Sequence, residues 1–323
     1  MLLLTSIPPR FSRKSPETGA EIGKDYLARC IQSWRRNGFV PISLNRPDEV
    51  DAVSALGIID CMAVSNREAR EPSKFGPCLG AIFDNVPHDQ PIAIVNADVY
   101  MLYGIGTADR LSRLCEEAVV AGRRLDVTHL GAKQGQIFAL GYDLFAFEPR
   151  KVPRTVANPI IRHFQLGSPW WDYAFPYACS REIRGLRLKE PFLVHQLHPD
   201  RWDPSTWAEI GMAALKACPS IENERIRQAR NTPAIGPAIG QAFIDALFEN
   251  DFEEVALPLR RIDPVFWRLP SVITTPHKRD PIGRKIRRAL KGLPNPDPAE
   301  RDPLRQKFKR AVRSIADPRT LTI

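Results

Sequence analysis

The first half of the chain alternates between short apolar runs and longer segments in which apolar residues recur every three or four positions. A short apolar run predicts a buried strand, and the longer recurrence predicts a helix with one buried face. Strands are predicted at 2–5, 40–44, 58–64 and 91–95, and helices at 24–36, 49–56, 77–85 and 107–120. This alternation predicts an α/β fold with an open, mostly parallel sheet flanked by helices on both faces. Ligands of such sheets bind outside the carboxyl ends of the strands, which directs attention to 5–10, 45–48 and 96–100.

The pattern changes after residue 123. Longer strands are predicted at 125–130 and 137–147, an aromatic helix at 170–179 and a further strand at 192–197. Beyond Pro204 the apolar spacing is helical, over 205–218, 221–230 and 235–248. We therefore expect a first domain over 1–203, a helical C-terminal extension over 204–258 and a proline-rich basic tail over 259–323, partly helical or disordered.

Composition narrows the class of protein. Of the 323 residues, 43% are hydrophobic and 26% are charged, which excludes global disorder. No apolar run reaches the roughly 18 residues needed to span a bilayer. The six cysteines lie far apart in the sequence, so we expect reduced, mostly buried thiols in a cytoplasmic protein and neither a disulfide framework nor a zinc site.

The positive charge is concentrated in the tail. Residues 259–323 hold 17 Lys and Arg against 6 Asp and Glu, a balance of +11, whereas the whole chain carries only +9. The remaining residues are therefore near neutral, and no nucleic-acid partner is expected. Basic and apolar residues mixed in this way predict that the tail holds the protein at an anionic membrane surface, on the inner face, with a solvated basic tail as the alternative.

The strongest candidate for chemistry is the segment IVNADV at 94–99. Asn96 and Asp98 follow an apolar strand two residues apart, a spacing that directs both side chains to the same side. Their oxygens would suit a hard divalent cation and, through it, a diphosphate. The alternative is a plain Asx turn at the end of a strand.

Six short segments occur in a characteristic order: LLTSIPPRF at 3–11, CIQSW at 30–34, ISLN at 42–45, NAD at 96–98, GYDLFAF at 141–147 and GSPWWD at 167–172. In order and spacing they resemble the GT-A glycosyltransferases, and more narrowly their bacterial and plant members that contain TSIPPR, NADI and WD. The resemblance covers about residues 1–200. It implies a GT-A-like fold, a nucleotide-diphosphate-sugar donor site in the first half and an acceptor site in the second.

The resemblance also implies roles for particular residues. It assigns the donor nucleotide and sugar to Thr5, Ser6, Arg10, Asn45, Lys74 and Asp143. It assigns a Mn²⁺ or Mg²⁺ ion to Asn96, Asp98 and His195. Asn96 departs from the acid that is common in the family, so weaker metal binding is expected. His195 is preferred to His198 because a spacing of three cannot place both on one face of a strand.

The acceptor side is expected around Trp170, Trp171 and Asp172. The indoles would stack on an acceptor sugar, and Asp172 would take the proton of its hydroxyl group as a general base. The alternative is an aromatic core helix in which Asp172 is a cap or an ion-pair partner.

The predicted function is transfer of a hexosyl group from a nucleotide-diphosphate sugar to a glycan or lipid-linked acceptor. A non-catalytic nucleotide- or sugar-binding module is the main alternative, because Asn96 weakens the metal motif. A nucleotidyltransferase is less favoured, since the N-terminal region has no glycine-rich phosphate loop.

Overall fold

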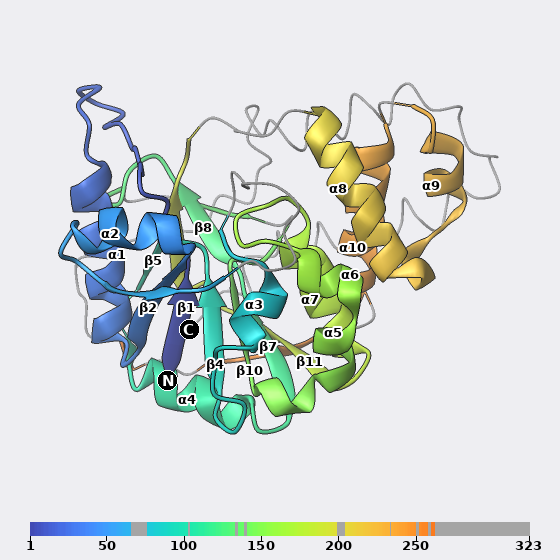
Figure 1. Cartoon of the computed structure of the whole chain (residues 1–323), viewed down its shortest axis with the longest axis horizontal. Helices are drawn as coiled ribbons and strands as arrows, with labels where there is room; N and C mark the ends of the chain where they lie inside the picture. The colour runs from blue at the N-terminus through green and yellow to red at the C-terminus, as the bar shows by residue number, and fades with distance from the viewer. Residues whose placement is uncertain are drawn as a thin grey trace, which may run out of the picture.

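The computed structural model describes residues 1–65, 76–102, 104–132, 135–138, 141–198, 204–232, 234–249, 252–257 and 260–261. Its centre is an eight-stranded sheet in the order β13-β11-β7-β10-β4-β1-β2-β3 (Figure 1). The strands are β1 (Leu2–Thr5), β2 (Val40–Asn45), β3 (Asp60–Ala63), β4 (Ile92–Val95), β7 (Ala118–Gly122), β10 (Leu144–Phe147), β11 (Arg184–Leu188) and β13 (Phe252–Val255). All neighbouring strands are parallel except β10, which is antiparallel to both β4 and β7. The predicted α/β fold with a mostly parallel open sheet is confirmed.

Both faces of the sheet are buried under helices, as expected for parallel strands. Successive side chains alternate between the two faces: Leu4 and Ile94 enter one apolar cluster, and Leu3 and Val95 enter the other. The first cluster also contains residues of α3 (Leu79–Phe83), α6 (Pro159–His163) and α7 (Trp171–Ser180), with α5 (Pro153–Ala157) packed beside it. The second contains residues of α1 (Gly23–Arg36), α2 (Pro47–Ser54) and α4 (Thr107–Leu114).

A four-stranded sheet lies beside the large one, in the order β5-β12-β8-β9. Its strands are β5 (Val99–Met101), β8 (Arg124–Val127), β9 (Gln136–Ile137) and β12 (Leu193–Gln196). The chain passes directly from β4 to β5 and from β7 to β8, so two strand ends of the large sheet continue into the small one. The junction therefore gathers side chains from the carboxyl ends of strands in both sheets.

The C-terminal part of the described chain adds α8 (Pro204–Ala217), α9 (Glu224–Ala229) and α10 (Ile235–Glu249), with a short 3₁₀ turn at Pro219–Ile221. These helices lie beyond α7 in Figure 1 and share its apolar cluster. Another short 3₁₀ turn, Pro149–Lys151, follows β10. A final pairing joins β6 (Gly104–Ile105) to β14 (Arg260–Arg261). Apart from residues 260–261, the basic tail predicted for 259–323 lies outside the described residues, and the domain boundaries stay predictions. No helix in the described ranges has the length and hydropathy that a bilayer crossing requires.

One predicted helix is wrong. The segment 107–120 forms α4 only as far as Leu114 and then becomes β7, a strand inside the large sheet. Leu111, Cys115 and Ala118 keep a helical spacing across this boundary, which is why periodicity alone extends the helix. The five residues of β7 are all buried, the pattern of a strand covered on both faces. The long strands expected at 125–130 and 137–147 are likewise shorter, as β8, β9 and β10.

Candidate functional site

The candidate site lies where β4 and β7 leave the large sheet. Asn96 follows β4, and Arg124 begins β8 just after β7. Asp143 precedes β10, and because β10 is antiparallel its start lies at the same edge as the ends of β4 and β7. The Asp143 backbone confirms this position, since its N–H donates to Gly122 O and its carbonyl accepts from Asn96 N. Sheet topology thus brings together residues that are far apart in the sequence.

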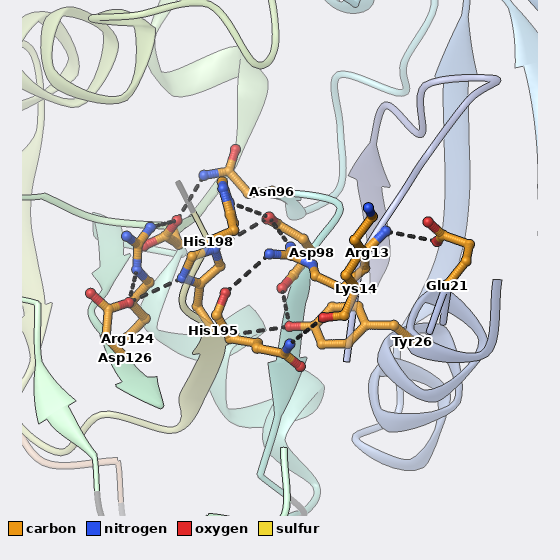
Figure 2. A network of polar contacts seen from close by, with 12 residues as sticks. Arg13, Lys14, Glu21, Tyr26, Asn96, Asp98, Arg124, Asp126, His195 and His198 are labelled. Carbon is orange, nitrogen blue, oxygen red and sulfur yellow. Dashed lines mark hydrogen bonds and ion pairs between the residues drawn. The ribbon is translucent and has the colours of Figure 1, made fainter. Parts of the chain in front are cut away.

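Asp98 is the centre of a cluster of nitrogen donors (Figure 2). Its Oδ2 atom lies 2.7 Å from Arg13 Nη2, 3.2 Å from His195 Nε2 and 3.3 Å from His198 Nε2. Figure 2 shows the two histidines on one side of Asp98 and Arg13 on the other. The expectation that only one of the two histidines faces the site is wrong. His198 lies beyond the end of β12 at Gln196, so the alternation of a strand no longer governs its direction.

Arg13 comes from the irregular segment between β1 and α1, and it is 3% exposed. Its Nη1 donates to Gln196 O at 3.1 Å, and its guanidinium carbon lies 4.8 Å from the centroid of the Tyr26 ring. Glu21 anchors the segment by accepting from Arg13 N and Gly23 N. Gly23 is required here, because a Cβ would meet Phe11 O at 2.7 Å. Arg13 is therefore held in place at its backbone and at its guanidinium.

Tyr26 ties three elements of the site together. Its hydroxyl donates to Asp98 O at 2.9 Å and accepts from Gln196 N at 3.1 Å. It thereby joins α1 to the turn after β4 and to the end of β12. Burial raises the pKa of Tyr26 far above its ordinary value, so the ring stays neutral.

A chain of charged groups continues from the histidines to Asp143. His195 Nδ1 lies 3.1 Å from Asp126 Oδ1, which accepts from Arg124 Nε at 2.7 Å. Arg124 Nη1 donates to Asp143 Oδ1 at 2.7 Å, and Asn96 Nδ2 donates to the same oxygen at 2.7 Å. The Asn96 oxygen points away from Asp98 (Figure 2). The predicted metal ligand Asn96 is therefore engaged with Asp143 and does not join the cluster around Asp98.

The electrostatics of the cluster favour the charged forms of Asp98, His195 and Asp126. Burial raises the pKa of Asp98, but the charge and hydrogen bond of His195, with His198 and Arg13, hold that pKa well below its ordinary value. Burial and Arg124 lower the pKa of His195, yet Asp98 and Asp126 outweigh them and raise it overall. Burial raises the pKa of Asp126 as well, and Arg124 with His195 lowers it overall.

Three residues of the cluster fit a divalent metal ion. Asp98, His195 and His198 each offer one ligand atom, and these atoms lie within 4.8 Å of one another. A carboxylate with two imidazoles suits Mn²⁺ better than Mg²⁺, which prefers oxygen ligands. Asp126 would hold the Nδ1 side of His195, so that Nε2 faces the ion, an arrangement common for ligating histidines.

Asp172 lies in the first turn of α7 and is partly buried. Burial and the charge of Asp143 raise its pKa to about 7, against smaller opposing effects of its own backbone N–H and of Arg124. A carboxyl group with a pKa near neutrality matches the requirement for a general base.

Trp170 and Trp171 lie in the core, 1% and 2% exposed. Trp170 stacks on Trp207 with ring centroids 4.6 Å apart and donates its Nε1–H to Trp207 O. Trp171 packs edge-on against Phe145 at 5.5 Å. This placement argues against sugar stacking by these two indoles and favours the alternative of an aromatic core helix.

The predicted donor residues fall into different environments. Thr5 is fully buried, and its Oγ1 has no hydrogen-bond partner within the described ranges. Ser6 packs so close to Gly76 that a Cβ there would meet Ser6 Oγ at 2.5 Å, and Arg10 is exposed. Asn45 is buried, and its amide bonds Ser43, Cys61, Glu49 and Ile7 O, which leaves its polar atoms fully used. Lys74 lies outside the described residues.

The sequence reasoning missed Arg13 and Asp126. Nothing in the sequence separates Arg13 from Arg10, because only the path of the loop brings Arg13 to Asp98. Asp126 does carry a signal. In the run RLDV, Arg124 and Asp126 alternate with apolar residues, which places both on one face of a strand, beside a buried core on the other.

Comparisons with known proteins locate similar solved structures only. No protein-family profile and no curated protein matches the sequence. A protein assigned as a nucleotide-diphospho-sugar transferase from Desulfovibrio desulfuricans is 12% identical over 79% of this chain and 98% of that one, with a TM-score of 0.36. The 4-diphosphocytidyl-2C-methyl-D-erythritol synthase of Anaerococcus prevotii is 11% identical over 52% of this chain and 77% of that one, with a TM-score of 0.30.

A third structure, HddC from Yersinia pseudotuberculosis in complex with GMP-PN, is 12% identical over 68% of this chain and 99% of that one, with a TM-score of 0.31. Similarities at this level do not assign an activity.

Proposed function

We propose that the protein is a glycosyltransferase that moves a hexosyl group from a nucleotide-diphosphate sugar to a glycan or lipid-linked acceptor. The observation that carries the proposal is the convergence of Asp98, His195 and His198 beside the carboxyl end of β4. Open parallel sheets bind their ligands at this edge. The ordered motifs that resemble the GT-A glycosyltransferases support the same assignment.

Asp98, His195 and His198 would hold a divalent cation, with Mn²⁺ preferred to Mg²⁺. Such an ion supplies positive charge that stabilises a departing nucleoside diphosphate. Arg13 and Tyr26 orient the Asp98 carboxylate and backbone, and Asp126 orients His195. The donor would lie between this cluster and Thr5, with Ser6, Arg10 and Lys74 as phosphate contacts.

Two buried oxygens support a ligand with hydroxyl groups. Thr5 Oγ1 and Asp143 Oδ2 have no hydrogen-bond partner among the described residues, although buried polar atoms are nearly always paired. Asp143 would accept from donor-sugar hydroxyls through this oxygen. Asp172 would act as the base that takes the proton of the acceptor hydroxyl, as its raised pKa allows.

The proposal is tested by a screen of UDP- and GDP-sugars with Mn²⁺, read by released nucleoside diphosphate. Turnover that depends on an added glycan or lipid-linked acceptor supports the transferase. Release of pyrophosphate from a nucleoside triphosphate and a sugar phosphate would instead identify a nucleotidyltransferase. Binding of UDP or GDP without turnover would favour the non-catalytic module.

A further inference from the structure

Arg13 already bonds the Asp98 oxygen that a cation would also use. Three nitrogens converge on the single oxygen Asp98 Oδ2, and Arg13 is the nearest at 2.7 Å. The Arg13 side chain is 2% exposed and Asp98 is 23% exposed, so the ion pair is shielded from solvent mainly on the arginine side. A guanidinium stays charged at any physiological pH, so this positive charge is permanent.

We propose that Arg13 is the internal counter-ion of Asp98 and couples cation binding to diphosphate binding. This inference rests on the proposed function and specifies how its metal site is loaded. A divalent cation must compete with the Arg13 guanidinium for the Asp98 carboxylate. Once displaced from that oxygen, Arg13 Nη2 is free to donate to a phosphate oxygen, while Nη1 stays bonded to Gln196 O.

The net charge of the network around Asp98 favours the same coupling of cation binding to diphosphate binding. Asp98, Asp126 and Asp143 are balanced in part by Arg13 and Arg124, while histidines that ligate a metal are neutral. The network then carries one net negative charge. A divalent cation turns this into one net positive charge, which attracts an anionic diphosphate. Without Arg13, the cation alone would bring the network to neutrality.

Asn96 contributes to this balance. Two residues before Asp98 the chain has the neutral amide of Asn96, which donates to Asp143 Oδ1 and adds no negative charge. One carboxylate must therefore serve both Arg13 and the cation. The site is built to hold a cation weakly by itself and more firmly together with an anion.

The experiment measures Mn²⁺ binding by the EPR signal of free Mn²⁺, and binding of UDP and GDP at saturating Mn²⁺ by calorimetry, on the full chain at one pH. In Arg13→Gln we expect Mn²⁺ alone to bind about tenfold more tightly, because a nearby positive charge is lost. We expect the diphosphate to bind at least about fivefold more weakly, because its guanidinium partner is lost. A purely structural role of Arg13 would weaken both.

Two further variants complete the test. Arg13→Lys keeps the charge, so it should bind Mn²⁺ as weakly as the native protein, and it tests the inference even if Arg13→Gln fails to fold. Arg184→Gln is the matched control, because Arg184 is an exposed arginine on β11 that pairs with Glu253 on β13, and neither affinity should change.

The outcomes distinguish failure of the role of Arg13 from failure of the proposed function. Equal or weaker Mn²⁺ binding by Arg13→Gln, or tight Mn²⁺ binding by Arg13→Lys, overturns the role of Arg13 while leaving the proposed function in place. Unchanged Mn²⁺ binding in Asp98→Asn, or no Mn²⁺ binding by the native protein and by every variant, overturns the metal site of the proposed function and this inference with it.

Discussion

At the residue scale, Asp98 has a structural task as well as a proposed metal-binding one. Its carboxylate neutralises Arg13, whose side chain is 2% exposed. Removing one member of a buried ion pair leaves an uncompensated charge, which commonly costs about 3–5 kcal/mol of stability. Because Asp98 is 23% exposed, the cost here should be smaller.

We therefore expect Asp98→Ala to lower the free energy of unfolding by about 2–3 kcal/mol, measured by urea denaturation. Asp98→Asn keeps an acceptor oxygen for Arg13 and should lose less stability, while it still loses Mn²⁺ binding. Native stability in both variants together with native Mn²⁺ affinity would contradict both tasks of this residue.

Asp172 allows a test that depends on pH. Its pKa is raised from 3.8 to about 7, so the folded protein holds a proton that the unfolded chain has released. The retained proton of Asp172 stabilises the folded state fully below about pH 4. This stabilisation is lost as the pH rises through about 7. Asp172→Asn has no such charge to bury. The unfolding temperature of Asp172→Asn should therefore rise relative to that of the native protein as the pH rises from 5 to 8.

The proposed role of Asp172 as a base has the opposite pH dependence. A base must be ionised, so turnover should rise with pH through about 7, and Asp172→Asn should lose about 10²–10⁴ in rate with little change in donor affinity. Native turnover in the folded Asn variant would leave only the structural role.

The individual residues of the site were predictable to different degrees. Asp98 follows an apolar run, and this local pattern selects it, whereas His195 was selected through the resemblance to the GT-A glycosyltransferases. His198 lies just beyond its strand, where a rule based on alternation fails. Arg13 depends on the path of an irregular loop of more than ten residues, which local spacing does not encode. Trp170 and Trp171 illustrate the reverse error, because an aromatic segment suits a sugar site and a core equally well.

At the scale of elements, the pairing of β8 with β12 positions His195. The parallel register places His195 opposite Asp126, and the Nδ1–Oδ1 distance is 3.1 Å. Arg124, on the same strand as Asp126, holds the carboxylate from the other side. Strand register, rather than a mobile loop, therefore fixes the direction of the imidazole.

We expect Asp126→Asn to weaken Mn²⁺ binding about 10- to 100-fold, because the orientation and basicity of His195 depend on this carboxylate. The measurement is the Mn²⁺ titration described above, with circular dichroism to confirm the fold. Asp60→Asn, at an exposed position on β3, is the matched control. Native Mn²⁺ affinity in a folded Asp126→Asn protein would remove Asp126 from the site.

Helices and strands were predictable from the sequence where only one pattern, an apolar run or a helical spacing, is present. Strands β1, β2 and β4 are short apolar runs, and α1 has regular helical spacing, so each was predictable. The α4–β7 boundary was not, because a helical spacing and a buried strand overlap at Ala118. Strands β11 and β13 were missed because their polar residues interrupt the apolar pattern: Arg184 and Arg187 pair with Glu253 and Glu254 across the sheet edge.

At the scale of the whole molecule, charge is distributed unevenly along the chain. The rest of the chain is near neutral, and some of its charges pair with one another, as in the network around Asp98, whereas residues 259–323 hold an excess of +11. A concentration of basic residues beside apolar ones suits an anionic membrane surface. An acceptor attached to a lipid would be found at such a surface, so the tail and the proposed activity are compatible.

Vesicle sedimentation tests this role of the tail directly. Each basic side chain near an anionic leaflet contributes about 1 kcal/mol, so engagement of only part of the tail would hold the protein at the membrane. We expect the full chain to sediment with phosphatidylserine-containing vesicles at low salt and to be released at high salt, because salt screens the attraction. A chain that ends after Arg261 keeps the pairing of β14 with β6 and should stay in the supernatant under both conditions. Neutral phosphatidylcholine vesicles are the control and should retain neither protein. Equal sedimentation of the two chains, or sedimentation of neither, would show that the tail does not direct the protein to a membrane.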